Sequence, residues 1–263
     1  EITTGPLGQG ISSAPGFALA ERILNARFGG DLCDHFTYVL ASDGDMQEGV
    51  SHEACALAGH LKLSKLIVMY DDNGISIDGK TELSFSEDVG KRFEAYGWDV
   101  QTIDGHDFAA IENALSNAHL TETPSLIRCK TKIGFGSPNK AGTHDVHGAP
   151  LGADEIELTR KKLDWPHAPF EIPEDILSAW REIGARGQNE YAAWKSRADA
   201  APSEYHKAIK GDHKEEIAPV VAHLKEKFAG DAPKMATRKT SGACLDQLVP
   251  ALPGLMGGSA DLT

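Results

Sequence analysis

The stretch that decides the fold opens with S-D-G-D-M-Q-E-G (residues 42–49) and ends with the apolar run L-I-V-M-Y (66–70) followed by D-D-N-G-I-S-I (71–77). Asp43 and Asn73 each follow a short apolar run, thirty positions apart. Neighbouring strands of an α/β sheet bring such residues to one point at their carboxyl ends. Mg²⁺ takes a few protein oxygens and completes its shell with phosphate oxygens. The spacing therefore predicts a diphosphate held through a metal ion.

Short apolar runs alternate with helical periods in the first half of the chain. This rhythm is typical of an α/β fold in which a parallel sheet carries helices on both faces. We expect strands at 37–41, 66–70, 100–103 and 125–130, and helices at 13–27, 47–61, 87–96 and 108–120. After a Gly-rich loop from Ile133 to Gly152, the pattern predicts a mostly helical and polar segment.

Composition limits the classes of partner. The 263 residues are 41% hydrophobic and 25% charged, as in soluble globular proteins. A net charge of −13 argues against nucleic acid and against an anionic membrane surface, and no apolar run approaches the roughly 20 residues that span a bilayer. The four cysteines form no CxxC pair, which favours a reducing, cytoplasmic location. The chain begins at Glu1 rather than methionine, so we interpret it as a piece of a longer protein and leave a targeting segment open.

The quoted stretch resembles the thiamine-diphosphate signature, which usually opens with Gly-Asp-Gly and closes with Asn-Asn about thirty residues later. Ser42 stands where the first glycine is usual, and the closing Asp72-Asn73 is the form that transketolases carry. Other strings match the same family: T-T-G-P-L-G-Q-G-I-S (3–12), H-G-A-P-L (147–151), A-T-R-K-T-S (236–241) and G-G-S-A-D-L-T (257–263). Taken singly, Asp-Gly and Asn-Gly are common turn dipeptides. Their spacing and flanking strands favour the cofactor site.

The resemblance implies a site for thiamine diphosphate and Mg²⁺, with Ca²⁺ or another divalent ion as a substitute. The implied metal ligands are Asp43, Asn73 and the carbonyl of Ile75. The implied cofactor contacts are Gly5, Pro6, Leu7, Asp43, Gly44, Asn73, Ile133, His147 and Asp261. His147 would also act as the catalytic residue that touches the reacting oxygens of the substrate, and Arg238 would bind its phosphate. For His144 a structural role is expected instead.

The resemblance also implies an activity and an assembly. The activity is transfer of a two-carbon ketol unit from a ketose phosphate to an aldose phosphate, in the pentose phosphate pathway or Calvin cycle. Residues 1–202 would form the diphosphate-binding domain, and residues 203–263 a connecting helical segment and the beginning of the pyrimidine-binding domain. A homodimer with active sites between its subunits is implied, with Glu48 and Glu53 at the interface. Dihydroxyacetone synthase, phosphoketolase and a non-catalytic cofactor-binding paralogue remain as alternatives.

Overall fold

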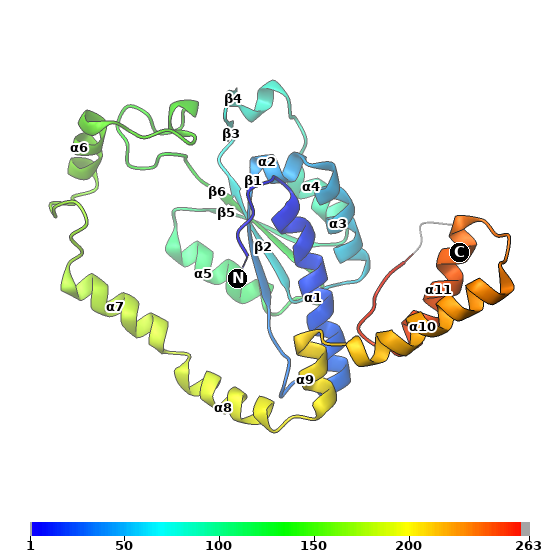
Figure 1. Ribbon diagram of the computed structural model, residues 1–263. Coiled ribbons are helices and arrows are strands. Elements are labelled where there is room, and N and C mark those ends of the chain that lie inside the picture. Colours follow the sequence, from blue (N-terminus) through cyan, green and yellow to red (C-terminus); the bar gives the residue numbers. More distant parts are fainter. Residues whose placement is uncertain (1, 259–263) are drawn as a thin grey trace. The chain divides into compact units, whose positions relative to one another are not determined.

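The computed structural model describes residues 2–258 (Figure 1). The chain divides into two compact units, of which the first ends at Tyr191 and the second begins at Ala192. The first unit holds the predicted sheet and the second is helical, and each is described by itself.

Four parallel strands form the sheet of the first unit, in the order β1 (Thr37–Ser42), β2 (Leu66–Asp72), β6 (Ser125–Lys130) and β5 (Asp99–Asp104). All four lie where the apolar runs predicted strands. Successive side chains of a strand point to opposite faces. Leu66, Val68 and Tyr70 of β2 accordingly enter one core cluster, and the alternate residues Ile67 and Met69 pack in the other.

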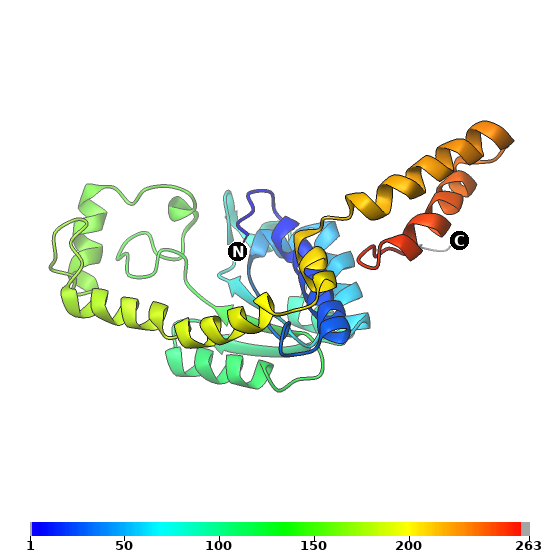
Figure 2. The same cartoon turned by 60° about the horizontal axis from the view of Figure 1, so that its bottom comes forward.

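Helices cover both faces of this sheet, which confirms the predicted α/β class (Figure 2). The larger cluster packs beneath α1 (Gln9–Phe28), α3 (Gly49–His60) and α4 (Val89–Ala95). On the other face, Ala114 and Ala118 of α5 (Phe108–Ala118) pack with Ile67 and Ile127. Asp107 caps α5 as its sequence position indicates, because its Oδ1 accepts the backbone N–H groups of Ala109 and Ala110.

The prediction of a single helix over 47–61 was wrong at its amino end. The structure has a short helix α2 (Asp43–Gln47), a break at Glu48 and then α3. Glu48 adopts extended backbone angles (φ −70°, ψ 133°), which interrupt the helical path. Gly8 packs against Glu48 at this break, since a Cβ on Gly8 would lie 2.8 Å from the Glu48 Cβ.

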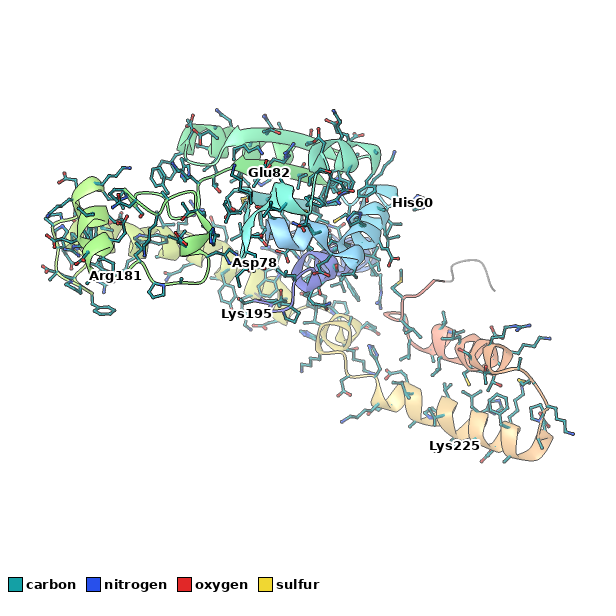
Figure 3. The ribbon with its side chains drawn as sticks, turned by 90° about the horizontal axis from the view of Figure 1, so that it is seen from above. His60, Asp78, Glu82, Arg181, Lys195 and Lys225 are labelled. Atoms are coloured by element: carbon teal, nitrogen blue, oxygen red, sulfur yellow. The ribbon has the colours of Figure 1, made fainter. Side chains whose placement is uncertain are left out.

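A small hairpin follows β2 and consists of β3 (Ile75–Ser76) and β4 (Gly79–Lys80), with the 3₁₀ helix η1 (Thr81–Leu83) after it. Figure 1 shows α2, β3 and β4 at the same end of the sheet. Figure 3 labels Asp78 in the turn of the hairpin and Glu82 in η1. The hairpin therefore continues directly from the stretch predicted to bind metal.

After β6 the chain forms a long loop with the 3₁₀ helix η2 (His144–Val146), then α6 (Ala153–Lys162) and α7 (Glu174–Ala185). The remaining helices are α8 (Gln188–Asp199), α9 (Ser203–Lys210), α10 (Lys214–Asp231) and α11 (Thr237–Ala251), of which α10 and α11 pack together in the second unit. None of the helices described between residues 2 and 258 combines the length and apolarity needed to cross a bilayer.

Candidate functional site

Asp43 lies at the carboxyl end of β1 and is 5% exposed. The Tyr70 hydroxyl donates a hydrogen bond to Asp43 Oδ1 at 2.6 Å, and the Gly74 backbone N–H donates to Oδ2 at 3.0 Å. β1 and β2 are neighbours in the sheet, with Ser42 opposite Asp71. The ends of the two strands therefore meet as the sequence predicted, and they bring Asp43 against the turn that contains Asn73.

The charges around Asp43 favour a bound cation. Burial raises the pKa of Asp43 above its ordinary value, the nearby Asp72 carboxylate raises it further, and the hydrogen bonds from Tyr70 and Gly74 oppose this rise. Asp72 is neutralised by Arg128 Nη2 at 2.9 Å and Lys130 Nζ at 2.7 Å. The hydrogen-bond donors to Asp43 are neutral groups. A buried carboxylate without a countercharge is costly, so a bound cation would stabilise its ionised form.

The oxygen atoms of Asp43, Asn73 and the Ile75 carbonyl are suitable ligands for a hard cation. Asn73 Oδ1 accepts the Ile75 N–H at 3.0 Å, which fixes the amide beside the first residue of β3. Carboxylate, amide and carbonyl oxygens are the ligands that Mg²⁺ and Ca²⁺ prefer. No group of three or more His, Cys, Asp or Glu residues able to hold a metal occurs between residues 2 and 258. The donor set predicted from the sequence, a carboxylate, an amide and a carbonyl oxygen, suits a hard divalent cation such as Mg²⁺, Ca²⁺ or Mn²⁺.

The loop formed by Gly5, Pro6 and Leu7 reaches the same corner. A Cβ on Gly44 would lie 2.9 Å from Leu7 Cδ1, so the glycine allows Leu7 to rest on the loop that follows β1. Gly44 is also one of the implied cofactor contacts, so the absence of a side chain at this position would serve both Leu7 and the cofactor. The structure therefore brings together the predicted residues Gly5, Pro6, Leu7, Asp43 and Gly44.

Two further residues of this corner were missed in the sequence analysis. Tyr70 was counted as an apolar strand residue, although its hydroxyl positions Asp43 from 27 residues away. Asp45 accepts hydrogen bonds from Ser42 and Gly8. A signal for Asp45 was present, because Ser42 and Asp45 have the S-x-x-D spacing of a helix start.

The long loop after β6 carries Ile133 and His147. It is anchored where it leaves the sheet, because the Lys132 N–H donates to His106 Nε2 at 3.0 Å and the His106 ring stacks on Phe135. A Cβ on Gly134 would lie 2.9 Å from Val146 Cγ2, so the start of the loop packs on the turn that precedes His147. His147 is exposed, and its backbone N–H donates to the His144 carbonyl at 2.9 Å. Its contact with cofactor and substrate stays a prediction.

Glu155, on the helix α6 that follows this loop, binds residues of the loop. Its carboxylate accepts hydrogen bonds from the Ser137 hydroxyl, from the Asn139 N–H at 2.8 Å and from Asn139 Nδ2 at 2.9 Å. These bonds, with that of Ser137 the largest contribution, lower the pKa of Glu155 from its ordinary 4.5 to about 2. A carboxylate with a lowered pKa in the folded state stabilises the fold above its ordinary pKa, and this contribution disappears as the pH falls through the folded value.

Glu155→Ala is therefore expected to destabilise the loop in a pH-dependent way. The difference from the wild-type chain should be largest above pH 4.5 and shrink as the pH falls towards 2. Hydrogen exchange of the Asn139 amide between pH 6 and 3 measures this difference. Glu157→Ala is the matched control, since Glu157 lies on the same helix but is exposed and paired with Lys161. A difference that does not change with pH would show that the carboxylate charge has no part in holding the loop.

Two predicted site residues do not belong to the described part of the first unit. Arg238 is exposed at the start of α11, in the second unit, and its role as a phosphate ligand stays a prediction. Asp261 lies outside the described residues, and its contact with the cofactor likewise stays a prediction.

Comparison with known proteins agrees with the geometry. Residues 1–221 match the family model described as the transketolase thiamine diphosphate binding domain. The chain is 51% identical over 265 residues to a transketolase of Cereibacter sphaeroides and 50% identical over 274 residues to transketolase 1 of Escherichia coli. All of this chain is covered, but it spans only 40% and 41% of the length of those relatives.

Solved structures show the same relationship. A transketolase crystal structure from Campylobacter jejuni superposes with a TM-score of 0.80 at 39% identity, over 99% of this chain and 40% of that one. A Pichia stipitis transketolase, described as a complex with sedoheptulose 7-phosphate, gives the same TM-score, identity and coverage. The family model matches far more than half of the residues, and the matching strings include those around Asp43 and Asn73. This chain belongs to the transketolase family.

Proposed function

We propose that this chain supplies the diphosphate- and metal-binding part of a transketolase active site, which transfers a two-carbon ketol unit from a ketose phosphate to an aldose phosphate. The proposal rests on the environment of the Asp43 carboxylate. A buried carboxylate with neutral donors lies where β1 and β2 end, beside Asn73 and below the Gly5–Leu7 loop. The family match adds the cofactor class.

Each residue has a defined task in this proposal. The metal ion, Mg²⁺ or Ca²⁺ in its place, would be held by Asp43, Asn73 and the Ile75 carbonyl. The diphosphate would be bound by Gly44 and the backbone of Gly5–Leu7. Thiamine diphosphate, when bound, supplies the carbon nucleophile that receives and passes on the two-carbon unit. Ile133 would pack beside its reactive ring, and Asp261 would lie near the same ring.

His147 is the residue that we propose to act on the substrate. An imidazole can donate and accept protons near neutral pH, which suits a group that orients the reacting oxygens of a sugar. The exposure of His147 leaves its ring available to a ligand. A homodimer in the cytoplasm, with active sites shared between subunits, follows from the family as part of the proposal.

Because the chain spans about two fifths of its relatives, the activity belongs to the full-length protein, and the isolated chain is expected to be inactive. The test is to incubate the full-length protein with xylulose 5-phosphate and ribose 5-phosphate, with and without thiamine diphosphate and Mg²⁺. Mass spectrometry should find a seven-carbon ketose phosphate only when the cofactor is present. Acetyl phosphate as the product would favour phosphoketolase chemistry instead. Bound cofactor without product would favour a non-catalytic paralogue.

Arg238 provides a second, independent test. Guanidinium groups bind phosphate through charge-assisted hydrogen bonds. We expect Arg238→Ala in the full-length protein to raise KM roughly tenfold or more for a phosphorylated sugar and to change KM little for its unphosphorylated counterpart. Lys239→Ala, which removes the same charge at the next position, is the control. Equal effects of Arg238→Ala on both sugars would remove the proposed role.

A further inference from the structure

Asp45 connects the two loops of the proposed cofactor site. Its Oδ1 accepts the Gly8 N–H at 2.8 Å, and its Oδ2 accepts both the Ser42 N–H at 2.9 Å and the Ser42 hydroxyl at 2.8 Å. Gly8 directly follows Leu7, and Ser42 directly precedes Asp43. We propose that Asp45 is a positioning residue, which holds the Gly5–Leu7 loop and the start of α2, Asp43–Gly44, at their binding distance before the cofactor arrives.

The chemistry of the three contacts requires a carboxylate. All three groups that face Asp45 donate hydrogens, one to Oδ1 and two to Oδ2. A carboxylate accepts at both oxygens, whereas an amide offers an acceptor on one side and a donor on the other. Charge-assisted bonds of this length are stronger than neutral ones. An asparagine at this position could therefore hold one loop well, but not both.

The loop that Asp45 holds is exposed. Gly5, Pro6 and Leu7 are exposed, and a Cβ on Gly5 would meet no atom within 4 Å. Fixing the backbone of a mobile residue costs conformational entropy. A loop that is already held avoids this cost when the ligand binds, so its affinity for the ligand is higher.

Ser42 contributes a hydrogen bond to Asp45 that a glycine at this position could not make. The residue stands where the family signature usually has glycine, and its hydroxyl supplies one of the three hydrogen bonds to Asp45. The departure from the signature therefore has a structural partner only three residues away. The inference rests on the proposed function, because it concerns the site for thiamine diphosphate.

The test compares Asp45→Ala, Asp45→Asn and Ser42→Gly in the full-length protein. Glu94→Ala, which removes an exposed carboxylate from α4, serves as the control. The measurements are the dissociation constant of thiamine diphosphate at saturating Mg²⁺, kcat at saturating cofactor, and exchange of the Gly8 amide without cofactor. We expect the dissociation constant to rise about tenfold or more in Asp45→Ala and about threefold in the two milder variants, with kcat unchanged.

The Gly8 amide should exchange faster in Asp45→Ala than in the wild-type protein, because this amide loses its acceptor. An unaltered dissociation constant together with a lower melting temperature would show a purely structural role and overturn the proposal. Asp45→Asn and Ser42→Gly keep the test decisive if Asp45→Ala does not fold. Failure of the proposed function is distinguishable, since the wild-type protein itself would then not bind thiamine diphosphate with Mg²⁺.

Discussion

Asp43→Ala is expected to abolish Mg²⁺-dependent binding of thiamine diphosphate by the full-length protein. The substitution removes the carboxylate ligand that we propose for the metal, and the remaining ligands, an amide and a carbonyl, carry no charge. It also leaves the buried Tyr70 hydroxyl without its acceptor, at a cost of about 1–3 kcal/mol in stability, and removes the acceptor of the half-buried Gly74 N–H. Calorimetric titration with cofactor at fixed Mg²⁺ measures the binding.

The loss of binding has to be separated from loss of folding. Circular dichroism at the temperature of the titration shows whether the Asp43→Ala protein is folded. Asp99→Ala is the control, because Asp99 is a carboxylate at the amino end of β5, the opposite end of the same sheet. We expect the control to bind cofactor like the wild-type protein. Unchanged affinity in a folded Asp43→Ala protein would contradict the site assignment.

Gly59→Ala is expected to destabilise the chain by about 3 kcal/mol, which is towards the upper end of the range for overpacked cores. Gly59 is buried near the end of α3, and a Cβ there would lie 2.0 Å from the carbonyl oxygen of Tyr96 and 3.1 Å from Trp98 Cδ1. The opposing backbone is held in place, since Trp98 Nε1 donates to the Cys55 carbonyl at 2.9 Å and the Trp98 N–H to the Phe93 carbonyl at 3.1 Å.

Gly16→Ala provides the matched control for this clash. Gly16 lies within α1, and a Cβ there would meet no atom within 4 Å. Because alanine is the better helix former, Gly16→Ala should raise the free energy of unfolding by up to about 1 kcal/mol. Urea denaturation of both variants measures the difference. Similar stabilities for the two variants would mean that the close approach of α3 to Tyr96 does not limit the residue at position 59.

The sheet was predictable because its central strands β2 and β6 are largely buried and read as apolar runs of the right length. Leu66–Tyr70 needs no partner to be recognised. The break at Glu48 was not predicted, and in the structure it lies against Gly8, forty residues earlier in the chain. Local sequence preferences indicate a helix, but they do not indicate which distant segment packs against it.

The candidate site shows the same division. Asp43 and Asn73 were found because each ends a strand, and parallel strands end at one edge. Tyr70 and Asp45 were missed because their importance lies in hydrogen bonds to other site residues rather than in a recognisable string. Arg238 and Asp261 rest on matching strings alone, since the structure describes the first in the other unit and does not describe the second.

The central claim is that Asp43, Asn73 and the Ile75 carbonyl hold one divalent cation that binds the cofactor diphosphate. The most direct measurement is a crystal structure of the full-length protein with thiamine diphosphate and Mn²⁺, located by its anomalous scattering. We predict a single peak at each site, with the three protein oxygens at about 2.0–2.6 Å, the range for hard cations, and with diphosphate oxygens completing the shell. A bound diphosphate whose cation lies away from Asp43 would contradict the account.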